Sequence, residues 1–458
     1  MFMRIRKHWI GLLIILTLLA AGCSQAPKIV KVAGTVVTQK GRPVSEGAVL
    51  IGSSMAKTST SGRFTISAPA GENKAVLLVK GYRPQIVPLT LSEESQTLTL
   101  TAKLDRPARH SGSTADYLLL LDSLHRTDVS SSAGFTYLTG AQVKEAALTH
   151  AGIVDLERAV QYLSPAAMHR LCELLGVRHI VWIQKDLDNH LQVFSVKSGR
   201  ISSLPFEESR GQRKLAGLLA SFSKDARMFA EQTPRGIEAN LAKEVKTYME
   251  QLYDVTYTGR DVQRIKRVAE PIIAVSERSN LPFTFGILEA EEYNAYALPG
   301  GYIYITRPLL EMMESEDELA AVLAHESAHI THVHAVKGYE RRVALTVATI
   351  FVAAATGGSD ATLDFVQIIG DIITEGYSKE QEYDADRTGL RYISRAGYDP
   401  EGMVSLLTKL QDLEYRLTGG RRTYSRTHPS TKSRFNQVKA ELSTVEYYRF
   451  LDEYLLSL

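Results

Sequence analysis

The pentapeptide His325-Glu326-Ser327-Ala328-His329 constrains this chain more than any other segment. Residues four positions apart lie on one face of an α-helix, so both imidazoles can reach a single metal ion. Glu326 follows the first histidine and can hold a water molecule beside that metal and accept its proton. Ser315 and Glu318 fit a capping box, and residues 319–323 continue as an apolar stripe, so a helix is expected to lead into the motif. The simpler alternative is a surface helix with two histidines by accident.

A second segment, residues 377–386, offers carboxylates for the same site. Residues 325–329 fit the HExxH pattern of zinc proteases. Such a site needs a third protein ligand and one position open to water. Glu382 and Asp386 are four apart and share a helix face. Glu382 suits the third ligand, and Asp386 suits a carboxylate that holds a ligand histidine through its other ring nitrogen. On spacing alone Glu380 and Asp384 are rival ligands, and an acidic solvated face is the remaining alternative.

Four blocks, in order, resemble the HtpX/BepA/CaaX-prenyl-protease type of zinc metallopeptidase, a gluzincin of peptidase family M48. The blocks are 294–305 (NAYALPGGYIYI), 325–334 (HESAHITHVH), 377–386 (YSKEQEYDAD) and 427–434, which begins Thr-His-Pro-Ser. The resemblance covers about 234–442, close to half of the chain. Its one departure is Lys379, where the family usually has arginine.

The resemblance implies that His325, His329 and Glu382 bind one zinc ion per chain and that Glu326 is the general base. Zinc lowers the pKa of a bound water toward about 7. Glu326 can then accept a proton at neutral pH and return it to the leaving amine. The resemblance also implies that His428 lies beside the metal. There it either fills the open position and holds the enzyme latent, or it steadies the oxyanion.

Three further polar residues of these blocks are His332, His334 and Arg434. His332 and His334 lie three and five positions after His329, and we interpret both as structural. Arg434 lies six positions after His428. It is either a polar partner in the wall of the site or an ordinary surface arginine.

The block Pro299-Gly300-Gly301-Tyr302 is the predicted substrate strand. The strand that begins at Tyr302 is expected to offer an unpaired edge, where an extended peptide adds as a further strand. The two glycines would let the substrate backbone approach closely. The alternative is a turn that enters an internal strand.

The N-terminus predicts a lipoprotein. Basic residues precede an apolar run over 10–21, which is typical of a signal peptide. Residues 19–23 (LAAGC) resemble a bacterial lipobox, so we expect residues 1–22 to be removed and Cys23 to be lipidated. Ser24 at the second mature position favours the outer membrane. A simple secretory signal or an uncleaved anchor is the alternative.

Composition limits the remaining possibilities. With 458 residues, 44% of them hydrophobic, the chain can build two or three domains, and a net charge of +2 argues against a nucleic-acid partner. Lipidation would use one of the two cysteines, so no internal disulfide remains. Cys172 lies in an apolar stretch and is predicted to be a core residue.

The expected fold is a multidomain chain with a mainly α (α+β) zincin-like peptidase domain at 234–445. Residues 23–105 read as short strands with turn signals and resemble the carboxypeptidase-regulatory-like β-sandwich. Residues 106–230 alternate strands and helices, which favours a small α/β domain. Residues 446–458 are expected to form a C-terminal helical tail. Two apolar segments within 343–373 are too short to span a bilayer, so a buried helical hairpin is expected, with membrane contact or a lid as alternatives.

Together these features predict a lipid-anchored zinc metalloendopeptidase. Its partners would be protein or peptide substrates, namely envelope or misfolded proteins, and the membrane that holds its anchor. It would face the periplasm from the bacterial outer membrane. The alternative is a lipid-anchored binding or chaperone-like protein of the same fold with little proteolysis.

Overall fold

The structure is a computed structural model that describes residues 28–106, 115–120, 137–138, 140–184, 190–205, 237–343, 376–418, 428 and 431–458. The chain divides into two compact units, Met1–Pro107 and Ala108–Leu458. The predicted signal peptide, Cys23 and residues 344–373 of the apolar segments lie outside the described residues. Within the described ranges, no helix combines the length and the apolar character needed to cross a membrane.

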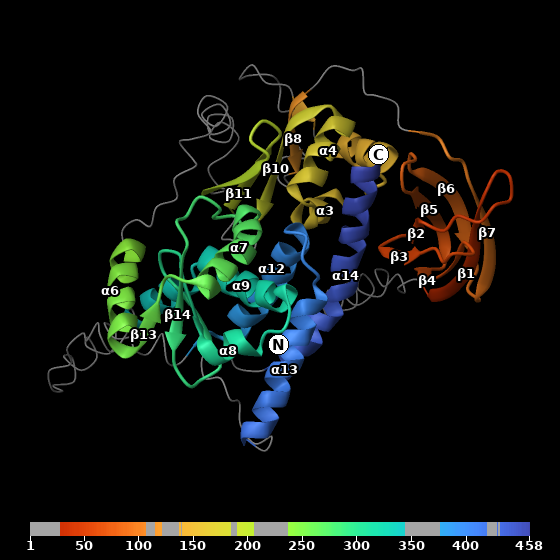
Figure 1. Ribbon diagram of the computed structural model, residues 1–458. Helices are drawn as coiled ribbons and strands as arrows, with labels where there is room; N and C mark the ends of the chain where they lie inside the picture. Colours follow the sequence, from red (N-terminus) through yellow and green to blue (C-terminus); the bar gives the residue numbers. More distant parts are fainter. Residues whose placement is uncertain are drawn as a thin grey trace, which may run out of the picture. The chain divides into compact units, whose positions relative to one another are not determined.

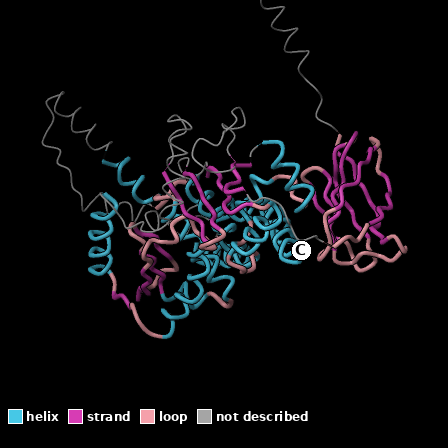
Figure 2. The backbone as a smooth tube through the Cα atoms, turned by 90° about the horizontal axis from the view of Figure 1, so that it is seen from above, coloured by secondary structure: helices cyan, strands magenta, loops and turns pink. Residues whose placement is uncertain are grey.

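The first unit contains seven strands, which Figure 2 draws in magenta and joins by pink loops. One sheet has the order β4-β1-β7, in which β1 (Ile29–Thr38) is antiparallel to β4 (Arg63–Pro69) and parallel to β7 (Gln96–Ala102). The other sheet has the order β3-β2-β5-β6 and is antiparallel throughout. Its strands are β2 (Gly47–Ile51), β3 (Ser54–Lys57), β5 (Gly71–Val79) and β6 (Gln85–Leu91).

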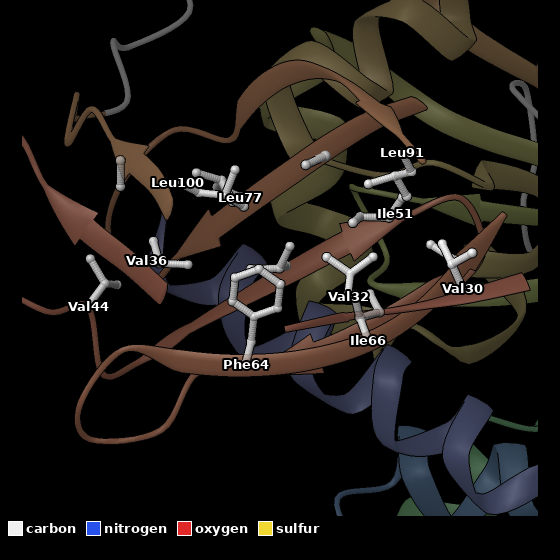
Figure 3. Close-up of a cluster of buried hydrophobic side chains, with 14 residues drawn as sticks. Val30, Val32, Val36, Val44, Ile51, Phe64, Ile66, Leu77, Leu91 and Leu100 are labelled. Atoms are coloured by element: carbon white, nitrogen blue, oxygen red, sulfur yellow. The ribbon is translucent and has the colours of Figure 1, made fainter. Parts of the chain in front are cut away.

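The two sheets share one apolar core. Val30, Val32 and Val36 of β1 are buried, and the residues between them, apart from Gly34, are exposed or partly exposed, which is the period-two pattern of a strand with one face on a core. Figure 3 shows these valines together with side chains of both sheets, among them Phe64 and Leu77. The unit is therefore a two-sheet sandwich.

The second unit begins with a five-stranded sheet of order β12-β11-β10-β8-β9. β8 (Ala115–Leu120) is parallel to β9 (Tyr137–Leu138) and to β10 (Val177–Gln184), whereas β11 (His190–Ser195) and β12 (Arg200–Pro205) continue antiparallel. Four elements lie between β9 and β10: α2 (Gly140–Ala146), the π-helical turn η2 (Ala147–Ala151), α3 (Leu156–Tyr162) and α4 (Pro165–Leu175). Cys172 of α4 is buried, as predicted.

The rest of this unit is a four-stranded sheet surrounded by helices. The sheet has the order β13-β14-β16-β15, built from β13 (Asp254–Thr256), β14 (Thr284–Glu289), β15 (Ala295–Leu298) and β16 (Tyr302–Thr306). The helices are α6 (Ile237–Leu252), α7 (Arg260–Ala274), α8 (Arg307–Met312), α9 (Glu316–Thr331), α12 (Lys379–Arg395), α13 (Glu401–Thr418) and α14 (Thr431–Ser457). As Figure 1 shows, α9 lies among α7, α12 and α13, and it packs against all three.

The strand that begins at Tyr302 is not an edge strand, so this part of the sequence prediction is wrong. β16 pairs with β14 on one side and with β15 on the other. Gly300 and Gly301 have φ values of 82° and 91° and form the turn between β15 and β16. A Cβ atom on Gly301 would lie 2.6 Å from the carbonyl oxygen of Pro282, so this glycine is needed for internal packing. Within the described residues, the two edge strands of this sheet are β13 and β15, and β15 is the strand before the glycines.

The α/β part packs directly on α14, a helix of the predicted peptidase domain. The ring of Tyr162 stacks on Tyr448 of α14 at 4.7 Å, and its hydroxyl donates to Oε1 of Glu441 at 2.7 Å. The N–H and hydroxyl of Ser164 donate to the carboxylate of Asp452, also on α14. Figure 1 shows the C-terminal end of α14 beside α3 and α4. α14 runs without a break through residue 446, where a separate tail was expected to begin, because its last turns are buried by these contacts.

Candidate metal centre

Two helices carry most of the predicted site residues. α9 begins at the N-cap Ser315, whose hydroxyl accepts the N–H of Glu318 at 3.1 Å, and it holds His325 and His329. α12 begins at Ser378, which forms a full capping box with Gln381. Gly389 lets the two helices approach, since a Cβ atom there would lie 3.3 Å from the backbone nitrogen of His325. The Glu318 carboxylate does not close a capping box; it accepts the N–H of Glu314 instead.

Four side chains converge between these helices: His325, His329, Glu382 and His428, with donor atoms within 4.8 Å of one another. The Nε2 atoms of the first two histidines are 3.1 Å apart. They lie 3.7 Å and 3.4 Å from the carboxylate oxygens of Glu382. Nδ1 of His428 is 2.9 Å from Oε1 of Glu382 and 3.4 Å from Nε2 of His325. The structure thus brings the three predicted ligands and His428 into one group.

Asp386 holds the outer side of His325. Its Oδ1 atom lies 2.9 Å from Nδ1 of His325, so the lone pair on Nε2 faces the cluster. Arg434 is buried, not on the surface, and donates to both oxygens of Asp386 at 2.7 Å and 2.8 Å. Its Nη1 atom also lies 2.9 Å from Oε2 of Glu382. One guanidinium therefore links the carboxylates of Glu382 and Asp386.

His329 is held by two residues to which the sequence interpretation gave no role at the site. Nδ1 of His334 lies 2.8 Å from Nδ1 of His329, so His334 contacts one of the predicted metal ligands. The ring of Tyr377 stacks on the His329 ring at 3.8 Å and 16°. The only signal in the sequence was position: His334 closes the motif block, and Tyr377 directly precedes the cap of α12.

Burial and charge set the protonation of the cluster. Burial alone would raise the pKa of Glu382, but the charges of His428 and Arg434 hold that pKa well below its ordinary value. Burial would likewise raise the pKa of Asp386, and Arg434 with His325 lowers it. Burial lowers the pKa of His329 well below its ordinary value, so this ring is neutral. A charged carboxylate beside neutral imidazole is the state that a metal ion requires.

Glu326 lies beside the cluster. Its Oε1 atom is 3.7 Å from Nε2 of His428, and its buried Oε2 atom has no hydrogen-bond partner among the described residues. Burial raises the pKa of Glu326, against the charges of His428 and His325. The carboxyl group is therefore a stronger base than an exposed glutamate.

The side of β15 that does not pair with β16 faces the same cluster and is buried. The carbonyl of Ala295 lies 3.4 Å from Nε2 of His428, and the carbonyl of Ala297 accepts the hydroxyl of Tyr377 at 2.8 Å. Residues two apart in a strand present their backbone groups on the same side, so both carbonyls point away from β16. His428 thus contacts both the carbonyl of Ala295 on this strand and the carboxylate of Glu382.

A pocket that is open to solvent adjoins the cluster. Its polar lining includes Glu326, His428 and Arg434. The opposite wall is apolar and comes from α8, α9 and α13: Leu309, Val322, Met403, Leu406, Leu407 and Leu410. An apolar wall beside a cluster of polar groups is the ordinary form of a ligand pocket.

The residues present fit a zinc ion. Two imidazoles and a carboxylate are a common zinc donor set, and in a tetrahedral site two ligands at about 2.0–2.1 Å from the metal lie about 3.3 Å apart. The donor atoms of His325, His329 and Glu382 are 3.1, 3.4 and 3.7 Å apart, which lies on both sides of that value. A fourth position remains for water or for His428.

The part of the chain that carries this site is similar to known metallopeptidases. Residues 260–442 match the family described as peptidase family M48. The mitochondrial metalloendopeptidase OMA1 of Schizosaccharomyces pombe is 31% identical over 185 residues, 40% of this chain and 54% of the relative. The putative beta-barrel assembly-enhancing protease of Vibrio cholerae is 31% identical over 183 residues, 38% of each chain. The metalloprotease LoiP of Escherichia coli is 29% identical over 166 residues, 35% of this chain and 64% of the relative.

The matched segment spans about half or less of the length of the first two of these relatives, and it contains α9, α12, His428 and Arg434. Residues 260–442 are therefore a peptidase family M48 domain, similar to those of known metallopeptidases.

Proposed function

We propose that this protein is a zinc-dependent metalloendopeptidase that cleaves peptide bonds of envelope or misfolded proteins at the periplasmic face of a bacterial membrane. The observation that carries this proposal is the convergence of His325, His329 and Glu382 beside the unpartnered Oε2 atom of Glu326. Cys23 is the proposed lipid attachment point, and the outer membrane the proposed location. The names of the bacterial relatives, among them a beta-barrel assembly-enhancing protease, are compatible with an envelope role.

His325, His329 and Glu382 would hold the zinc ion. When bound, zinc supplies Lewis-acid chemistry that makes water a better nucleophile near neutral pH and polarises a carbonyl group. Oε2 of Glu326 takes the proton of the attacking water and then passes it to the leaving amine nitrogen. Asp386 and Arg434 keep the His325 ring and the Glu382 carboxylate oriented throughout.

The substrate would add along β15, because this strand holds the edge beside the cluster. The carbonyl of Ala295 would accept a backbone N–H group of an extended peptide after His428 moves away, and the carbonyl of Ala297 would accept another beside the hydroxyl of Tyr377. One substrate side chain would then enter the pocket against the apolar wall of α8, α9 and α13. A bulky apolar residue next to the cleaved bond is the expected preference.

His428 is the proposed latch. Its imidazole lies among the ligand atoms, and its Nε2 atom contacts Ala295 of the edge strand. In this position one residue blocks both the fourth metal position and the start of the substrate edge. Release of His428 would open both together.

The experiment is digestion of β-casein by the purified full-length chain, before and after chelation and again after zinc is restored. Cleavage that chelation abolishes and zinc restores, with large apolar residues enriched next to the cut sites, is the expected result. Cleavage that persists after complete zinc removal would contradict the proposal. Cuts without an apolar preference would contradict the assigned pocket only.

A further inference from the structure

We propose that Gln161 and Arg391 are positioning residues for the metal centre, through which α3 of the α/β part holds the ligand helix α12 in place. Figure 1 shows α3 beside α12 and α14, and it packs against both. This role rests on the proposed zinc site, and it gives the α/β part a function that the peptidase chemistry alone does not explain.

α12 has a second polar face besides the one that holds Glu382 and Asp386. Thr388, Arg391 and Arg395 follow one another at intervals of three and four residues, so they share a face. At about 100° per residue, that face points away from the ligand carboxylates. All three residues are buried. A buried polar face needs hydrogen-bond partners from its surroundings.

The end of α3 contacts this face at two points. Nη1 of Arg391 donates to Oε1 of Gln161 at 3.1 Å. Four residues further along α12, Nε of Arg395 donates to the carbonyl of Leu163 at 3.2 Å. The amide of Gln161 is itself oriented, since its Nε2 atom donates to the carbonyl of Glu157 at 3.2 Å. Its Oε1 atom is therefore directed at the guanidinium.

From Arg391 the contacts continue to the helix that carries the histidine ligands. Nη2 of Arg391 donates to Oγ1 of Thr388 at 2.9 Å, and that hydroxyl lies 3.2 Å from Nε2 of His332. His332 is the C-cap of α9, three positions after His329. Polar contacts therefore connect Gln161 to the end of α9, next to a predicted ligand.

The same segment of the α/β part also holds α14. The hydroxyl of Tyr162 donates to Glu441, and the hydroxyl of Ser164 donates to Asp452, both on α14. α14 carries Arg434, which bridges the two carboxylates of the metal centre. Four consecutive residues thus bind α12 and α14 together and help to set the position of Arg434 relative to its carboxylate partners.

The chemistry of the contact between Gln161 and Arg391 favours positioning over stability. Gln161 and Thr388 are neutral, so their hydrogen bonds direct the guanidinium without cancelling its charge. A buried charge costs free energy, and an apolar side chain of similar length often serves a fold as well or better. What arginine supplies here is a planar fork that binds α3 and the hydroxyl of Thr388 at the same time.

The test is the zinc affinity of the full chain, measured by competition with a coloured chelator alongside thermal unfolding. Arg391→Met removes the fork, and Gln161→Met removes only its acceptor. Each should weaken zinc binding by about 2–30-fold. The double variant should bind zinc no more weakly than Arg391→Met, because both changes break one contact. Arg170→Met, at an arginine of α4 in a solvent-exposed pair with Glu173, is the matched control and should keep wild-type affinity.

A conservative variant separates positioning from a general loss of structure. Gln161→Glu keeps an oxygen acceptor in the same place and should keep wild-type zinc affinity. If Arg391→Met does not fold, the two variants at Gln161 decide the question. Wild-type affinity in Gln161→Met would overturn the proposal, and so would effects that add in the double variant.

These outcomes are separate from those of the proposed peptidase function. Zinc affinity is measured without cleavage, so a wild-type chain that binds zinc but leaves β-casein intact would contradict the peptidase and not the role of Gln161 and Arg391. A wild-type chain that binds no zinc would overturn both.

Discussion

The sandwich core and the metal centre bury side chains in opposite ways. The core of the first unit consists of apolar residues, and Thr58 is the only buried polar side chain among the described residues of that unit. Around α9 and α12 the chain instead buries histidines, carboxylates and an arginine, among them His329, Glu382 and Arg434. Apolar burial stabilises a fold directly. Buried charge does so only when every charge has a partner.

This difference shows what each region is built for. A replacement in the sandwich core removes packing and leaves no charge behind. A replacement in the metal centre leaves partners such as Asp386 or Arg434 buried and unpaired. The buried polar groups of the metal centre do not by themselves stabilise the fold. We therefore expect substitutions there to reduce metal binding and activity before they reduce stability.

The largest effect is expected at the ligands. His329→Ala removes one of three protein ligands, and no other side chain of α9 lies in its place, so bound zinc should fall far below one per chain and proteolysis should vanish. Elemental analysis after dialysis against zinc-free buffer measures this. His169→Ala, at an exposed position, is the control and should keep its zinc. Full zinc occupancy in His329→Ala would remove this residue from the ligand set.

His428→Ala tests the latch and should have the next largest effect. If the latched state is favoured by about 1.4 kcal/mol, the active site is blocked in about nine-tenths of the molecules. Removal of the latch should then raise basal cleavage about tenfold. Initial rates on a short peptide, with zinc content measured in parallel, give the answer. If His428 instead stabilises the oxyanion, cleavage should fall by about 10²-fold while zinc stays bound. That fall would replace the latch with a role in the reaction.

Arg434→Lys should have a moderate effect. Lysine keeps the charge but cannot bridge Asp386 and Glu382 in fork geometry. Loss of such outer partners typically lowers metal affinity by about 10–100-fold, and because lysine keeps the charge the expected fall is at or below the lower end of that range. Zinc competition with a coloured chelator measures the change. Arg449→Lys, at an exposed ion pair, is the matched control. Wild-type affinity in Arg434→Lys would show that the guanidinium does not position the ligands.

Leu77→Ala should have the smallest effect on the site. The side chain lies in the sandwich core, and its truncation should destabilise that unit by about 2–5 kcal/mol. Zinc content and specific activity should stay unchanged, because the residue belongs to the other compact unit. Calorimetric unfolding together with metal analysis would show both. A loss of zinc in Leu77→Ala would break the distinction between the two regions.

The sequence predicted the elements that local patterns determine. The spacing of His325 and His329 predicted a helix, and the spacing of Glu382 and Asp386 predicted a shared face on the next ligand helix; both helices are present. The short apolar runs and turn signals of residues 23–105 predicted strands, and β1 is one of them. Periodicity and capping act within a few residues, so they can be read directly from the chain.

Features that depend on distant contacts could not be read in this way. The edge of the sheet was assigned to the strand at Tyr302, but edge position depends on the order in which strands pair, which places β15 outside. Likewise, Arg434 and Tyr377 meet the histidines only because α12 packs on α9 and α14 packs on α12. The docking of Tyr162 on α14 also has no local signal.

The most direct test of the central claim is Glu326→Gln, measured for zinc content and for β-casein cleavage in the same preparation. The amide keeps the shape of the side chain but cannot accept a proton, so zinc should remain at the wild-type level while cleavage falls by about 10²–10⁴-fold. Cleavage at a near wild-type rate with zinc bound would place the base elsewhere. A wild-type protein that holds zinc but does not cleave would favour a binding or chaperone-like role for the same fold.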